Sequence, residues 1–125
     1  MKVVFDTHAW MEYFLGSSQG SIVERHFAEE IITPFIVLLE LGYRADQEGW
    51  NFQQHLDFIK SKSRIARVSE EFIVAFGKLY NQTKEKIKGF GLADAIVLRT
   101  AEMEHASILT GDEHFKEFPK VIFLR

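Results

Sequence analysis

Four carboxylate side chains stand in or directly beside apolar stretches of the sequence, where a charged group is costly to bury. They are Asp6, Glu40, Asp94 and Asp112. An ionised carboxylate in apolar surroundings costs several kcal/mol in effective desolvation unless a cation or hydrogen-bond donors compensate it. Each acid therefore needs a partner, and the kind of partner decides whether the position is structural or chemical.

Each of these acids also has a structural explanation when it is taken singly. Asp6 and Asp112 can cap a following helix or helical turn, and Asp94 can cap its helix or stand in the first turn. Glu40 can pair with Arg44, one turn further along the same helix, for about 0.3–0.5 kcal/mol if the pair is exposed. For any one position, these explanations are as good as a chemical role.

Short apolar segments alternate with helical patterns along the chain, and this alternation predicts the elements that position the acids. We expect strands at residues 2–5, 30–33, 65–68, 107–110 and 121–124. We expect helices at residues 7–15, 21–28, 34–48, 50–63, 69–88 and 92–105, with a helical turn within residues 111–118. This order is typical of the α/β class, with a short, mainly parallel sheet flanked by helices.

The expected sheet brings the four acids to one edge. Asp6 and Asp112 follow strands, and sites in parallel α/β folds form at the carboxyl ends of strands. Glu40 and Asp94 lie in helices that begin at that same edge. Four convergent carboxylates repel one another, and a divalent cation relieves the repulsion. Oxygen ligands select Mg²⁺ or Mn²⁺, and such ions activate water to hydrolyse a phosphodiester bond.

Four short motifs around these acids resemble, in order, the motifs of PIN-domain nucleases. They occupy residues 3–7, 33–41, 91–96 and 109–115 and read VVFDT, TPFIVLLEL, GLADAI and LTGDEHF. The chain length and the Glu-Leu pair of the second motif are also similar to the toxin half of VapBC toxin–antitoxin modules. The resemblance extends over nearly the whole chain, which makes it more specific than any one motif.

This resemblance implies a PIN-like three-layer α/β/α fold over residues 1–125 as a single domain. It also implies a Mg²⁺- or Mn²⁺-dependent endoribonuclease that acts on RNA, forms a homodimer and is neutralised by an antitoxin protein. The expected catalytic and metal-binding residues are Asp6, Glu40, Asp94 and Asp112. Thr7 and Thr110 are expected to support them as hydroxyls that orient a carboxylate or a water molecule.

Two histidines follow the acids at one spacing, because His8 comes two residues after Asp6 and His114 two residues after Asp112. A mixed Asp/His site would favour Mn²⁺, Fe or Zn²⁺ over Mg²⁺. The more ordinary interpretation is that both are surface or capping histidines.

Basic side chains that can contact RNA phosphates are Arg44, Lys84, Lys86, Lys88 and Arg99. The alternative for the lysines is a solvated helix end, where cations suit the helix dipole. The formal net charge of −3 does not exclude RNA, because setting aside the four clustered acids changes it to +1.

Several other function classes are disfavoured by what the sequence lacks. Cys is absent, which excludes thiolate metal sites and disulfides, and no apolar run approaches membrane-spanning length, so we expect a soluble cytoplasmic protein. An aspartyl-phosphate phosphatase would need an acid where His8 stands. No Gly-rich phosphate loop with Lys and Ser or Thr is present. The remaining alternative is a catalytically inactive PIN-like binding or scaffold domain, which metal binding at the acids would distinguish from the nuclease.

Overall fold

The computed structural model describes residues 1–124, and its centre is a five-stranded sheet. The strands are β1 (Lys2–Phe5), β2 (Glu30–Thr33), β3 (Ser63–Ile65), β4 (Ser107–Thr110) and β5 (Val121–Phe123). Their order across the sheet is β3-β2-β1-β4-β5, and each neighbouring pair is parallel. The predicted α/β class with a parallel central sheet is confirmed.

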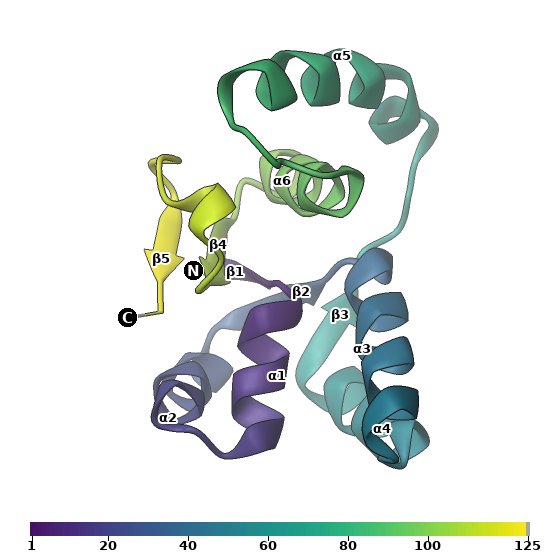
Figure 1. Cartoon of the computed structure of the whole chain (residues 1–125), viewed down its shortest axis with the longest axis vertical. Coiled ribbons are helices and arrows are strands. Elements are labelled where there is room, and N and C mark those ends of the chain that lie inside the picture. The colour runs from purple at the N-terminus through teal and green to yellow at the C-terminus, as the bar shows by residue number, and fades with distance from the viewer. Residues whose placement is uncertain (125) are drawn as a thin grey trace.

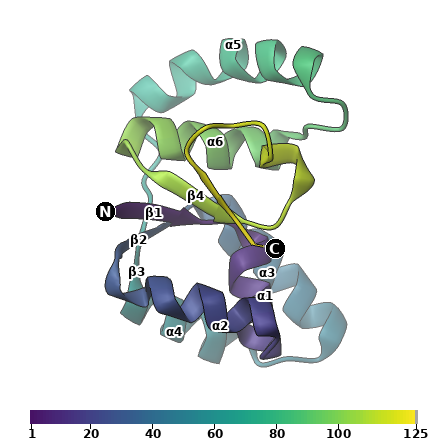
Figure 2. The same cartoon turned by 90° about the vertical axis from the view of Figure 1, so that its left-hand side faces the viewer.

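Helices cover both faces of this sheet. They are α1 (Thr7–Leu15), α2 (Ser18–Arg25), α3 (Phe35–Glu48), α4 (Phe52–Lys62), α5 (Glu70–Lys86) and α6 (Leu92–Glu104), with two short 3₁₀ helices, η1 (His26–Ala28) and η2 (Glu113–Phe115). Helices α1 to α4 lie on one face, whereas α6 covers the other face and α5 packs on the outside of α6 (Figure 1 and Figure 2). The predicted three-layer α/β/α arrangement is confirmed.

The central strands are apolar on both faces because helices cover them on both sides. In β1, Val3, Val4 and Phe5 are fully buried. The register pairs Phe5 with Leu109 of β4 and Val4 with Ile32 of β2. The carboxyl ends of these neighbouring strands are therefore aligned, and the residues that follow them emerge at one edge of the sheet.

Helix α2 begins three residues earlier than the sequence predicts. The hydroxyl of Ser17 caps it by accepting a hydrogen bond from the backbone N–H of Gly20 at 3.1 Å. Gly20 also allows α2 to approach α1 closely, because a Cβ at this position would lie 2.4 Å from the carbonyl oxygen of Glu12. The glycine that reads as a loop residue in the sequence is thus required by helix packing.

The predicted strand at residues 65–68 is wrong, because β3 spans Ser63–Ile65. The Ser63 hydroxyl bonds the Thr33 hydroxyl and the Ile59 carbonyl, each at 2.8 Å, and so ties the end of α4 to β2. Ile65 pairs with Thr33, the last residue of β2. Ala66 still donates its N–H to the carbonyl of Thr33 at 2.9 Å, but β2 ends at Thr33, so the chain after Ala66 does not continue the strand.

Candidate active site

The four predicted acids line one small pocket at the carboxyl edge of the sheet. The pocket has a volume of about 120 Å³ and is lined by Asp6, Thr7, His8, Glu40, Ala93, Asp94, Val97, Asp112 and Phe115. The acids come from the β1–α1 junction, α3, the first turn of α6 and the β4–η2 junction. Two larger hollows, of about 470 and 500 Å³, lie elsewhere beside α6, and none of the four acids lines them.

Asp6 is the most buried of the four acids, with 5% of its surface exposed. Its Oδ1 accepts a hydrogen bond from the Ala9 N–H at 3.1 Å, and its Oδ2 accepts one from the Thr110 hydroxyl at 2.5 Å. Burial, with a smaller contribution from repulsion by Asp112, raises the pKa of Asp6 to about 7 against the opposing effect of these hydrogen bonds. The carboxylate therefore lacks a counter-charge, which a cation beside it would supply.

Glu40 is oriented by the hydroxyl of another residue that lines the pocket, Thr7. Thr7, the first residue of α1, donates a hydrogen bond to Glu40 Oε1 at 2.5 Å. Within residues 1–124, no ion pair joins Glu40 to Arg44. The structural explanation of this acid by a pair along the helix is therefore not observed.

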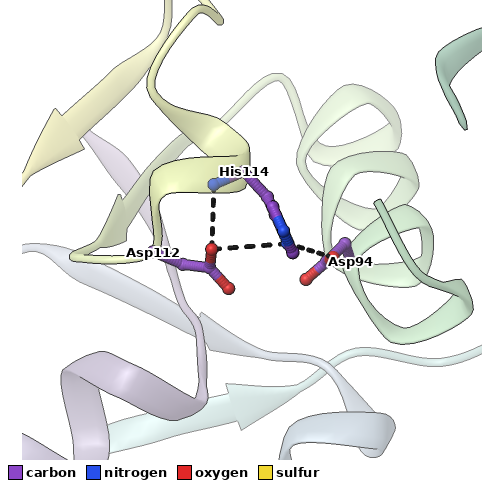
Figure 3. Close-up of side chains that lie close together, drawn as sticks. All are labelled: Asp94, Asp112 and His114. Carbon is purple, nitrogen blue, oxygen red and sulfur yellow. Dashed lines mark hydrogen bonds and ion pairs between the residues drawn. The ribbon is translucent and has the colours of Figure 1, made fainter. Parts of the chain in front are cut away.

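Asp94 and Asp112 lie on either side of the His114 ring (Figure 3). The Nδ1 atom of His114 is 2.9 Å from Asp94 Oδ2 and 3.5 Å from Asp112 Oδ1. Asp112 Oδ1 also accepts the backbone N–H of His114 at 2.8 Å. One ligand atom from each of the three residues lies within 4.8 Å of the others. The imidazole is thus part of the acid cluster.

Three of the acids also cap helices, as their structural explanations predicted. Asp6 caps α1 and Asp112 caps η2, whereas Asp94 accepts the N–H of Gly91, the N-cap residue of α6, at 2.9 Å. A cap satisfies backbone N–H groups that the first helical turn leaves unpaired. Capping does not exclude a chemical role here, because all three caps lie at the same pocket.

The two supporting threonines contact the acids. Besides its bond to Asp6, the Thr110 hydroxyl accepts the backbone N–H of Asp112 at 3.0 Å. It therefore links two of the four acids, while the Thr7 hydroxyl holds a third, Glu40.

The basic residues that were expected to contact RNA are not among those that line the pocket. Lys84, Lys86 and Lys88 are exposed at the end of α5 and beyond it. Arg99 faces α5 instead of the acids, because its Nη2 donates to the carbonyl of Glu71 at 3.3 Å.

The histidines are closer to the acids than their sequence interpretation as surface or capping residues suggests. His114 contacts two acids, whereas His8 lines the pocket and places Nε2 3.1 Å from Gln19 Oε1. The His8 ring lies against the β4–η2 turn, where a Cβ on Gly111 would come within 2.5 Å of it. The Asp-x-His spacing was the available signal, but spacing does not reveal which way a ring points.

The donor set of the pocket fits a divalent cation. Carboxylate oxygens are hard ligands that suit Mg²⁺ and Mn²⁺. No Lys or Arg is among the pocket-lining residues of the described chain, so no side chain there carries a permanent positive charge. Burial raises the pKa of Asp6, so a cation beside this acid would favour its ionised form.

The arrangement of motifs, sheet and pocket has a counterpart among known proteins. The family model described as the PIN domain matches residues 3–121. The chain belongs to the PIN domain family. A comparison of this PIN domain with curated proteins found no match.

Solved structures with the same fold come from toxin–antitoxin complexes. One is a toxin–antitoxin complex from Klebsiella pneumoniae, with a TM-score of 0.77, 19% identity and 98% of both chains covered. Another is VapBC2 from Rickettsia felis bound to a DNA fragment from their promoter, with a TM-score of 0.75, 23% identity and 98% and 97% covered. A third is DNA-bound VapBC from Salmonella typhimurium, with a TM-score of 0.73, 15% identity and 98% and 96% covered. At these identities the likeness establishes the fold.

Proposed function

We propose that this PIN domain is a Mg²⁺- or Mn²⁺-dependent endoribonuclease and the toxin component of a type II toxin–antitoxin system. The observation that carries the proposal is the convergence of Asp6, Glu40, Asp94 and Asp112 on one pocket. PIN domains are nucleases, and the neighbours of this fold in toxin–antitoxin complexes support the assignment to that class.

The bound cation would activate water and neutralise charge on a phosphodiester. The four acids are the residues that would hold it. The hydroxyl of Thr110 fixes one carboxylate oxygen of Asp6 and the backbone of Asp112, so these two acids keep a common orientation. The hydroxyl of Thr7 fixes Glu40. These bonds pre-arrange the acids, which lowers the cost of ordering them when a cation and a substrate bind.

The RNA backbone, not its bases, is the part of the substrate that suits this pocket. The pocket is small, and the N-termini of α1 and α6 both lie at it, where their partial positive charge favours a phosphate. Lys88 directly precedes Gly89, whose backbone lies against the ring of His114. The segment that carries Lys88, just after the end of α5, therefore lies beside His114, and this lysine would contact a neighbouring phosphate.

An apolar surface on α3 and α5 supports the proposed protein partners, a second copy of the chain and an antitoxin. Phe35, Val68 and Ile73 line an apolar hollow of about 140 Å³, and Ile73 is 62% exposed. Leu39, on the same helix as Phe35, is also 62% exposed. Neighbouring exposed apolar side chains mark protein interaction sites.

This partner surface can be tested by light scattering after gel filtration. We expect the wild type to run as a dimer and Ile73→Glu to run as a monomer, because a buried charge would oppose association. Lys78→Glu, on an exposed position of the same helix, is the control and should leave the dimer intact. A dimeric Ile73→Glu variant would mean that the two copies meet elsewhere.

We assign the protein to the cytoplasm. The absence of Cys suits a reducing compartment. In residues 1–124, no helix has the length and apolarity needed to cross a membrane.

The nuclease is tested with partner-free protein and mixed cellular RNA in Mn²⁺, in Mg²⁺ and in EDTA. Cleavage should require metal and disappear in Asp94→Asn, which keeps an oxygen to accept the Gly91 N–H but loses the charge. Asp46→Asn is the matched control, because Asp46 is exposed on α3 and does not line the pocket. Cleavage that survives in EDTA or in Asp94→Asn would show that the active site is elsewhere.

The alternative function, an inactive binding or scaffold domain, makes a different prediction for the same samples. It expects no RNA cleavage in either metal, and it does not require the acids to bind Mn²⁺. Thermal unfolding with and without Mn²⁺ measures that binding independently of activity, because a ligand that binds the native state raises the unfolding temperature. The nuclease proposal expects a Mn²⁺-induced rise in the wild type and in Asp46→Asn, and a clearly smaller rise in Asp94→Asn.

A further inference from the structure

The ring of His114 occupies an unusual position for a surface histidine. Its Nδ1 atom lies 2.9 Å from Asp94 Oδ2 and 3.5 Å from Asp112 Oδ1 (Figure 3). Within residues 1–124, no other histidine has a ring nitrogen within 4.0 Å of two acids of the pocket. His8, the other imidazole at the pocket, has its Nε2 near Glu12 and Gln19 instead.

The orientation of this ring is fixed by its surroundings. The backbone N–H of His114 donates to Asp112 Oδ1 at 2.8 Å, and the next residue, Phe115, is buried and anchors η2. On the other side, Gly89 has a φ of +82°, and a Cβ there would lie 3.1 Å from Nε2 of His114. The Nε2 edge therefore lies against the backbone of Gly89, which leaves the Nδ1 edge facing the acids.

A ring nitrogen this close to two carboxylates has two chemical options. It can donate a proton to them, or it can share a cation with them. The ligand atoms of Asp94, Asp112 and His114 lie within 4.8 Å of one another. Two ligand atoms of one common divalent ion lie at most about 4 to 5 Å apart, which is twice the length of a metal–ligand bond. The observed span is close to this limit. One ion can therefore contact all three residues without a rearrangement of the backbone.

We propose that His114 is a nitrogen ligand of the divalent cation, together with Asp94 and Asp112, and that it makes the site prefer first-row transition ions such as Mn²⁺ to Mg²⁺. Mg²⁺ favours ligation by oxygen alone, whereas imidazole binds transition ions well. The inference rests on the proposed function, since the same cation serves the nuclease. It adds a ligand and a metal preference to that function.

The test uses Mn²⁺ itself as the probe and does not depend on RNA cleavage. Pulsed electron paramagnetic resonance of the protein with one equivalent of Mn²⁺ detects a coordinated nitrogen through its coupling to the metal. We expect this coupling in the wild type and its loss in His114→Asn and in His114→Asp, two variants that offer different side-chain shapes. His8→Asn is the matched control, because it removes the imidazole that lines the pocket without contacting Asp94 or Asp112, and it should retain the coupling.

Titration calorimetry on the same proteins measures the metal preference. Mn²⁺ affinity should fall at least about tenfold in His114→Asn, by analogy with the loss of other groups that support a metal site. Mg²⁺ affinity should fall much less, so the ratio of the two affinities should drop.

Three results would overturn the proposal: bound Mn²⁺ without nitrogen coupling in the wild type, coupling that survives in both His114 variants, or coupling lost in His8→Asn. If bound Mn²⁺ shows no nitrogen coupling but RNA cleavage still depends on metal, the proposed nuclease function would hold. His114 would then only position Asp94. A wild-type protein that binds no Mn²⁺ would refute the proposed function as well.

Discussion

Within residues 1–124, Asp6 is the only acidic or basic side chain that is buried. Replacing it by Asn removes the charge and keeps the shape of the side chain. In the metal-free protein, burial raises the pKa of Asp6 from 3.8 to about 7. Because each pKa unit corresponds to about 1.4 kcal/mol, the ionised carboxylate destabilises the native state by about 4 kcal/mol. Between about pH 4 and pH 7 the native state holds a proton that the unfolded chain has released, so the free energy of unfolding falls as pH rises through that window.

The Asn variant avoids this cost and introduces a smaller one. Its amide oxygen can still accept the Ala9 N–H. Its amide nitrogen, however, would face the Thr110 hydroxyl, which in the wild type donates to Asp6 and accepts the Asp112 N–H. A mismatched hydrogen bond of this kind costs about 1 kcal/mol. Without metal, we therefore expect the two proteins to be within about 1 kcal/mol of each other at pH 5, and the variant to be more stable by about 3 kcal/mol at pH 8.

Urea unfolding followed by circular dichroism, in EDTA and across this pH range, measures the difference directly. Mn²⁺ should then remove most of this difference at high pH, because a ligand at a hundred times its Kd stabilises the native wild type by about 2.7 kcal/mol and the variant has lost one of its ligands. A stability difference that does not change with pH would refute the argument from burial. Equal stabilisation of both proteins by Mn²⁺ would show that Asp6 does not hold the cation.

Two further substitutions, each with a comparison variant, test the residues around the acids. Gly111→Ala should displace the His8 ring and destabilise the protein by about 1 kcal/mol in thermal unfolding, because its Cβ would lie 2.5 Å from that ring. Gly77→Ala, in α5 with nothing within 4 Å of the new Cβ, should instead stabilise it by up to about 1 kcal/mol, and destabilisation there would indicate a contact that the structure lacks. Thr7→Val should lower the rate of RNA cleavage, because it removes the hydroxyl that holds Glu40, and it should cost only about 1 kcal/mol of stability. Thr7→Ser keeps a hydroxyl and should keep most of the rate. Equal rates in the two Thr7 variants would exclude this positioning role.

Elements set by local patterns were predictable from the sequence. The run Val3, Val4 and Phe5 is apolar without alternation, which indicates a strand buried on both faces, and the structure places it in the middle of the sheet. The convergence of the four acids also followed from local reasoning, because the carboxyl ends of parallel strands share one edge.

Features set by contacts between distant residues were not predictable in the same way. The extent of β3 depends on where its partner β2 ends, at Thr33, and not on the apolar residues that follow Ile65. The start of α2 depends on how closely Gly20 lets it pack on α1. The direction of the His114 ring depends on the backbone of Gly89, a position 25 residues away in sequence. No local pattern carries this information.

Asp6, Asp94 and Asp112 both line the pocket and cap helix starts. Their presence in the sequence of a relative is therefore not by itself a sign of activity. A copy of this domain that lost its activity would still be selected for an N-cap side chain at the positions of Asp6 and Asp112, and at Asp94 for a side chain that accepts the Gly91 N–H. Aspartate at these three positions can therefore outlast catalysis. Glu40 lies in the interior of α3 and caps nothing, so its loss would be the earliest sign in a sequence that a member of the family no longer cleaves its substrate.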